Sequence, residues 1–113
     1  LSIADGTFSL CTSLSQIHLP EELHSIGSHA FDGCTSLSEI DLPEGLQSIA
    51  SNAFNGCTSL GVIHLPEGLE SIASNAFNGC TEIDRIYIKT EDDHDDVKFN
   101  RIKNLLPANL QSL

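Results

Sequence analysis

The stretches SIGSHAFDGCTSLSEIDLPEGLQ (residues 25–47) and SIASNAFNGCTSLGVIHLPEGLE (residues 48–70) follow one another and agree at most positions. Two outer copies extend the pattern, so that four units of equal length cover 2–24, 25–47, 48–70 and 71–93. A fixed period of roughly 20–29 residues is typical of solenoids, in which each unit buries its apolar side only against its neighbours. We therefore predict a stack of four coils over residues 1–93.

Each unit divides into two arms. In the second copy, Ile40-Asp41-Leu42 alternates apolar and polar residues, which predicts a short strand with Asp41 facing outward. Pro43 should end this strand, because proline cannot donate to a ladder. The second arm carries an Ala-Phe pair that recurs at 30–31, 53–54 and 76–77. Stacking in register would place one phenylalanine per coil in a continuous column and join the strands in a parallel sheet.

The two ends depart from the pattern. Leu10 stands where the later copies have glycine, and Lys89 stands where the earlier copies have proline. Residues 94–113 should form a cap and tail: a helix begun by Asp95 or Asp96, ended by Pro107, and carrying on its apolar positions Val97, Phe99, Ile102, Leu105 and Leu106. The first coil shows no such cap, so we expect further coils upstream, or end-to-end self-association there.

Charge is distributed unevenly along the chain. The net charge is −11, from 16 acidic and five basic residues, and no Lys or Arg precedes Arg85. Nucleic acids bind through Lys and Arg, so this balance argues against a nucleic-acid partner and against an anionic membrane surface. No apolar run reaches the roughly 18 residues that a membrane-spanning helix requires. The chain opens on Leu1 within a repeat, as expected of a mature or partial chain.

The pattern Leu-x-x-Ile-x-Leu-Pro-x-x-Leu-x-x-Ile-x-x-x-Ala-Phe-x-x-Cys, read from Leu37 to Cys57, resembles the BspA-type leucine-rich repeat. The resemblance implies a right-handed α/β leucine-rich-repeat solenoid with a concave parallel sheet, to which the C-terminal helical cap is added. It also implies a binding role without catalytic residues. Such proteins are often secreted or surface-exposed on host-associated microbes, and similar arrays occur in effectors delivered into host cells.

The cysteines and acidic residues that could bind metal ions are better explained by a structural role. Four cysteines, one per copy, occupy equivalent positions (Cys11, Cys34, Cys57 and Cys80). Zinc ligands lie two to four residues apart, so we expect free thiols in an internal column, with disulfides between adjacent coils as the alternative. Glu21, Glu44 and Glu67 should form a solvated rim. The acidic run at 91–96 lacks the glycine and final glutamate of a calcium loop, and is expected to be a turn and helix cap.

The outward strand positions vary between copies whereas their neighbours stay fixed. Two columns should form on the concave face, composed of Gln16, Glu39, Val62 and Arg85 and of His18, Asp41, His64 and Tyr87. We predict that these eight residues bind a partner, because the scaffold positions are occupied by packing. A merely solvated face is the alternative. A metal held by His18, Asp41 and His64 is not expected, since strands about 4.8 Å apart separate the outer two ligands too widely.

The sequence thus predicts a protein-interaction module, secreted or on the cell surface, that binds a host or cell protein through its concave face. The alternatives are a structural spacer, or the targeting half of a delivered effector. We expect no enzymatic activity and no cofactor, because the sequence contains no GxSxG, HExxH or phosphate-binding loop.

Overall fold

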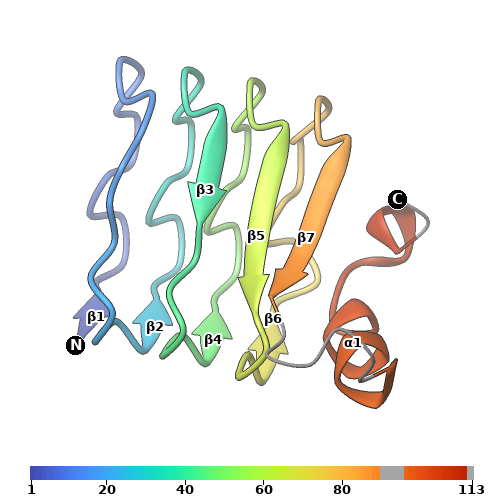
Figure 1. Ribbon diagram of the computed structural model, residues 1–113. Helices are drawn as coiled ribbons and strands as arrows, with labels where there is room; N and C mark the ends of the chain where they lie inside the picture. The colour runs from blue at the N-terminus through green and yellow to red at the C-terminus, as the bar shows by residue number, and fades with distance from the viewer. Residues whose placement is uncertain (90–95, 112–113) are drawn as a thin grey trace.

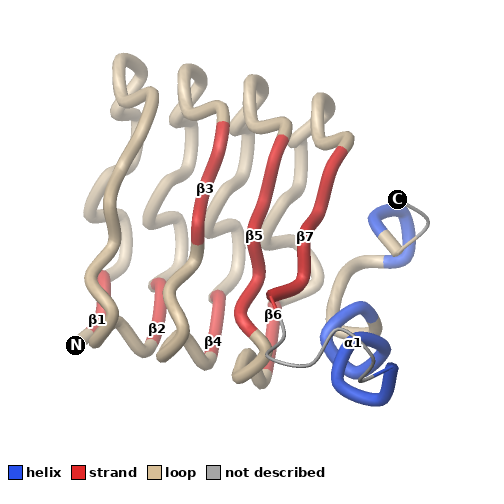
Figure 2. The backbone as a smooth tube through the Cα atoms, in the orientation of Figure 1, coloured by secondary structure: helices blue, strands red, loops and turns tan. Residues whose placement is uncertain are grey.

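Two parallel sheets run along the stack, one on each arm of the coils (Figures 1 and 2). The computed structural model describes residues 1–89 and 96–111. The four coils stand side by side from the N-terminus, and the C-terminal helix lies at the far end of the stack (Figure 1). The predicted leucine-rich-repeat solenoid with a C-terminal helix is confirmed.

The first sheet has the order β3-β5-β7 and contains the predicted strands, β3 (Glu39–Asp41), β5 (Val62–Pro66) and β7 (Arg85–Lys89). Each residue pairs with the equivalent residue of the next copy, so that Ile40 lies opposite Ile63 and Ile63 opposite Ile86. The inward isoleucines and the outward polar residues alternate as expected of a sheet with one buried face. In β5 the proline itself is the last strand residue, and it pairs with Lys89.

The second sheet was not predicted. It joins two-residue strands of identical sequence, Ser-Ile, in the order β1 (Ser2–Ile3), β2 (Ser25–Ile26), β4 (Ser48–Ile49) and β6 (Ser71–Ile72). These strands are too short to show an alternation in the sequence. The remainder of this arm consists of turns, among them a column of glycines with φ between 73° and 80° (Gly33, Gly56 and Gly79).

The core lies between the two arms and is organised around the predicted phenylalanine column. Neighbouring rings of Phe8, Phe31, Phe54 and Phe77 stack with centroids 5.1–5.2 Å apart. Phe31 and Phe54 are completely buried and Phe77 is 5% exposed. The spacing of the rings follows from the coil spacing, because equivalent residues lie one above the other.

The first coil is the least regular. Residues 16–19 form no strand, although the pattern predicts one there, and the first sheet begins at β3. A coil at the edge of the sheet has a neighbour on one side only. In this arm the first coil is joined to the second by the hydrogen bond from Ser38 N–H to Ser15 C=O, at 3.4 Å, whereas the other arm makes shorter bonds, such as Phe8 N–H to Ala30 C=O at 2.7 Å. Leu1 and Leu10 remain 69% and 72% exposed.

The cap consists of α1 (Asp96–Lys103) and a 3₁₀ turn, η1 (Ala108–Leu110). Its buried residues are Ile102, Leu106 and Leu110. Two of the residues expected on the apolar face are instead exposed, Val97 at 80% and Phe99 at 43%. The helix packs against β7, the last strand of the first sheet. No described helix is long and apolar enough to cross a membrane.

Candidate functional site

The eight predicted binding residues lie on the outward side of the first arm, and with Lys89 they make up what we call the sheet face. Six of the eight are exposed, whereas Val62 and His64 are half-buried. Residues of successive coils lie directly beside each other, as Asp41 does to His64 and His64 to Tyr87. Gln16 and His18 belong to the first coil and lie beyond the edge of β3. The structure therefore brings the predicted residues together on one side of the molecule.

His64 is the most constrained side chain on the sheet face. Its Nε2 lies 2.8 Å from Oε2 of Glu39, one coil back. Its ring stacks on Tyr87, one coil forward, with centroids 5.0 Å apart and planes 16° apart. Three strands thus contribute to one arrangement of carboxylate, imidazole and phenol. Tyr87 remains 46% exposed, which leaves an aromatic group of the type that dominates protein interfaces open to a partner.

Lys89 belongs to the sheet face, although the sequence analysis did not place it there. Its ammonium group donates to Oδ1 of Asp41 at 2.5 Å and to the carbonyl of Leu42 at 2.8 Å, two coils back. The signal was present in the sequence, because residues 85, 87 and 89 alternate with the isoleucines and therefore share one side of the strand. Lys89 therefore neutralises part of the acidic charge on the middle of the face.

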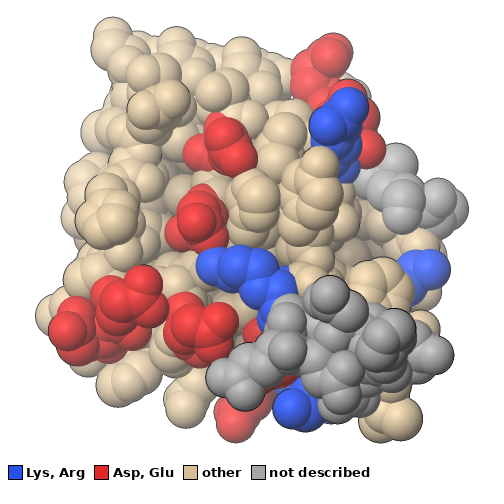
Figure 3. Space-filling model, in the orientation of Figure 1, with Lys and Arg blue, Asp and Glu red and all other residues tan. Residues whose placement is uncertain are grey.

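A shallow hollow lies at the N-terminal side of the sheet face. It has a volume of about 400 Å³ and is lined by Gln16, Ile17, His18, Glu39 and Asp41. Acidic side chains gather over this half of the face and along its lower rim, whereas basic side chains lie toward the cap (Figure 3). The hollow is thus acidic and polar with one apolar residue in its wall.

The cysteines form the expected column of free thiols, but only its middle is buried. Cys34 and Cys57 are completely buried, whereas the end residues Cys11 and Cys80 are half-exposed because no further coil covers them. Thiols donate to the phenylalanine carbonyl of the preceding coil, as Cys57 does to Phe31 at 3.1 Å. Contact with the Cys80 thiol and burial raise the pKa of Cys57, and burial raises the pKa of Cys34. Neutral thiols of this kind serve packing.

The other acidic positions form no ligand cluster in the described ranges. Glu21 and Glu44 are exposed, whereas Glu67 is half-buried, with its carboxylate 3.8 Å from the Lys98 ammonium group of α1. Among residues 1–89 and 96–111, no group of three His, Cys, Asp or Glu side chains could hold a metal ion. Residues 91–95 of the acidic run, with Asp95 as a helix cap, lie outside the described residues; Asp96, the other candidate cap, is the first residue of α1.

Comparison with known proteins supports the architecture. A family model described as the BspA type leucine rich repeat region, with six copies, matches residues 1–110. The curated proteins gave no match. Among solved structures, a leucine rich cell surface protein from Faecalibacterium prausnitzii has a TM-score of 0.78 and 29% identity, over 89% of this chain and 28% of that one.

Two further structures show the same coils. A leucine-rich repeat protein from Bacteroides ovatus has a TM-score of 0.73 and 40% identity, over 75% of this chain and 22% of that one. The leucine-rich repeat protein of T. pallidum has a TM-score of 0.59 and 33% identity, over 76% of this chain and 51% of that one. The chain therefore spans about a quarter of the length of the first two. Because the family model matches nearly the whole chain and these structures share its coils, the chain belongs to the family of BspA-type leucine-rich repeat proteins.

Proposed function

We propose that this chain binds a protein partner through its sheet face, and that it does so at the cell surface or after secretion. Leucine-rich repeats generally act as protein-interaction modules, and a similar structure is that of a cell surface protein. The resemblance to BspA-type repeats is the reason for proposing a host protein, or a protein of another cell, as the partner.

One observation carries the proposal: along the strands of the first sheet, the side chains that vary from coil to coil lie together on the outward face, whereas the repeated apolar side chains between them face the core. Ile40, Ile63 and Leu65 are completely buried. The outward residues between them differ in charge, size and aromaticity, although packing places no demand on them. A face that served only solvation would need no fixed arrangement, yet His64 is held from both sides by Glu39 and Tyr87.

The partner surface should be basic where it meets the N-terminal half of the sheet face. Glu39 and Asp41 line the hollow there; Lys89 pairs with Asp41, but among the described residues Glu39 has only the His64 imidazole beside it, and residues 1–84 contain no Lys or Arg. Complementary charge would speed association and fix the orientation of the partner. Tyr87 lies toward the cap and would supply apolar contact area.

The test is a pull-down with the chain from host-cell lysate and from extracellular matrix. The face variant carries Glu39→Ala, Asp41→Ala and Tyr87→Ala, all at exposed positions. The control variant carries Ser51→Ala, Thr58→Ala and Ser59→Ala, three exposed residues that lie in turns and not on the sheet face. Both should keep the circular dichroism spectrum of the parent.

We expect the captured protein to be lost with the face variant and kept with the control. Equal capture by the two variants would rule out the sheet face as the binding surface. No capture by the parent chain, in either extract, would instead favour a structural spacer, whose length matters more than its side chains.

A further inference from the structure

The third and fourth coils share an identical sequence, SIASNAFNGCT, at residues 48–58 and 71–81. Each copy contains an asparagine followed by glycine, Asn55-Gly56 and Asn78-Gly79. Asparagine is among the thermolabile residues of proteins, and a following glycine leaves the next backbone nitrogen unshielded, because glycine has no side chain. Since the two sequences agree, any difference in reactivity between the two asparagines must come from their places in the stack.

The backbone nitrogen after the asparagine is held in the third coil and free in the fourth. Gly56 N–H donates to the carbonyl of Asn78 at 2.8 Å, as Gly33 N–H donates to that of Asn55 at 2.8 Å. These hydrogen bonds run from each coil to the next, and the fourth coil is the last. Gly79 is exposed, and its N–H donates to no residue that the structure describes.

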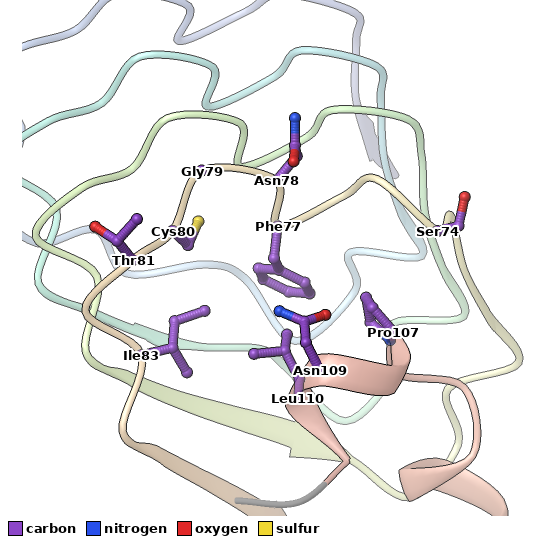
Figure 4. A pocket seen from close by; sticks show the side chains of 10 residues that line it. All are labelled: Ser74, Phe77, Asn78, Gly79, Cys80, Thr81, Ile83, Pro107, Asn109 and Leu110. Carbon is purple, nitrogen blue, oxygen red and sulfur yellow. The ribbon is translucent and has the colours of Figure 1, made fainter.

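The two asparagine side chains differ in the same way. Asn55 is half-buried, and its Nδ2 donates to Oδ1 of Asp32 at 3.1 Å. Asn78 is exposed, and its side-chain amide bonds to none of the described residues. It points away from the hollow that Phe77 and Asn109 line (Figure 4). The amide of Asn78 can therefore rotate toward the following nitrogen, whereas that of Asn55 is held.

We propose that Asn78 is a site of spontaneous deamidation, with the backbone nitrogen of Gly79 as the nucleophile. This nitrogen bonds to the side-chain carbon Cγ of Asn78 and gives up its proton. The bond from Cγ to Nδ2 breaks, and the amide nitrogen leaves as ammonia. Water then opens the resulting succinimide at either carbonyl, which yields aspartate or isoaspartate. Water is the only co-reactant that the sequence of steps requires.

The fourth coil can accommodate both products. Aspartate already occupies the equivalent position of the second coil, as Asp32 before Gly33. In isoaspartate the former main-chain carbonyl of residue 78 becomes a carboxylate, which can still accept from Gly56 N–H. Either product adds one negative charge to the net charge of −11 and places it at the end of the stack. The modification should therefore change the charge of the chain and leave its fold intact.

The experiment ages the whole folded chain at slightly alkaline pH and locates the carboxylates formed by mass spectrometry. Cleavage after glutamate at acidic pH separates residues 45–67, with Asn55, from residues 71–82, with Asn78. We expect Asn78 to react at least roughly tenfold faster than Asn55, because each of the two hydrogen bonds that hold Asn55 and Gly56 lowers the population of the reactive conformation about fivefold. In concentrated urea the two asparagines should react at equal rates, since their sequences are identical.

Two variants give an independent readout, by isoelectric focusing of the aged, folded chain. The parent should develop an acidic form, and Asn78→Gln should not, because glutamine would have to close a larger and less favourable ring. The matched control is Asn75→Gln, at an exposed position that alanine follows. This control should develop the acidic form as fast as the parent, and all three proteins should keep the same circular dichroism spectrum.

The proposal is overturned if Asn55 reacts as fast as Asn78 in the folded chain, or if Asn78 keeps its amide while the unfolded chain loses it. Formation of the acidic form by Asn78→Gln at the parent's rate would also overturn it. A difference between the two asparagines that persists in urea would contradict the structural cause. None of these outcomes bears on the sheet face, which lies on the other arm.

Discussion

Replacing Phe54 by alanine tests whether the phenylalanine column holds the coils together. Phe54 is completely buried and stacks on Phe31 and Phe77, with centroids 5.1 and 5.2 Å away. Truncation of a buried phenylalanine costs about 3–5 kcal/mol, and each stacked pair contributes about 0.5–1.5 kcal/mol beyond its buried area. The matched variant is Phe8→Ala, in which a half-buried ring with one stacking partner is removed. We expect that variant to lose only about 1–2 kcal/mol, because less apolar area and one stacked pair disappear.

The assay is urea unfolding of both variants, followed by far-ultraviolet circular dichroism. A domain of this size has a free energy of unfolding of about 5–15 kcal/mol, so Phe54→Ala removes a large share of it. With a urea dependence of about 2 kcal/mol per molar, the Phe54→Ala midpoint should fall by about 2 M and that of Phe8→Ala by less than about 1 M. Equal midpoint shifts would refute the reasoning, since they would mean that burial between two coils adds nothing.

Three further predictions concern the turns, the thiols and the cap. Gly56→Ala should lower the free energy of unfolding by about 1 kcal/mol, because the φ of Gly56 is 73°. Leu10→Gly should raise it by about 0.5 kcal/mol, because the φ of Leu10 is 62°. Urea midpoints that move in the same direction for both variants would contradict this. The raised pKa values of Cys34 and Cys57 mean that the folded chain keeps protons that the unfolded chain loses above about pH 9, near the ordinary pKa of a thiol. The contribution of Cys34 and Cys57 to stability should therefore be constant below that pH and fall above it by up to about 1.4 kcal/mol per pH unit for each thiol, and a Cys57→Ala variant with an unchanged alkaline slope would disprove the assignment. The guanidinium group of Arg101 donates to the carbonyls of Leu69 and Glu67. Arg101→Ala should therefore speed amide hydrogen exchange at Ile102 and Leu106 about fivefold and leave the exchange at Ile40 unaltered. Uniform acceleration would show that the cap does not open as a separate unit.

The repeat period explains why most of the fold could be predicted. A constant repeat length places Phe31 over Phe54 and Asp41 over His64 whatever the detailed path of the chain, so the core column and all of the sheet face except Lys89 followed from the sequence. The two-residue strands did not, because Ser48–Ile49 is too short to show a period. The buried side of α1 depends on where the helix crosses β7, which the apolar residues alone could not decide.

The contacts that connect different coils were also beyond sequence analysis. The bond from Lys89 to Asp41 crosses the strand between them, and depends on a lysine side chain lying flat on the face. In the described part of the chain the N–H groups of Phe77 and Gly79 have no acceptor, because the hydrogen bonds of the turns run from each coil to the next, and that direction is visible only in the structure. Both features arise at the C-terminal end, where the copies depart most from the shared pattern.

Site-specific photo-cross-linking tests the central claim, that partners meet the chain at its sheet face, most directly. A benzophenone side chain would replace either Tyr87, on the sheet face, or Ser51, which is exposed on the opposite arm. Each protein would be irradiated in host-cell lysate and in extracellular matrix. We predict a cross-linked partner from position 87 and none from position 51; cross-links from position 51 alone, or of equal yield from both positions, would contradict the account.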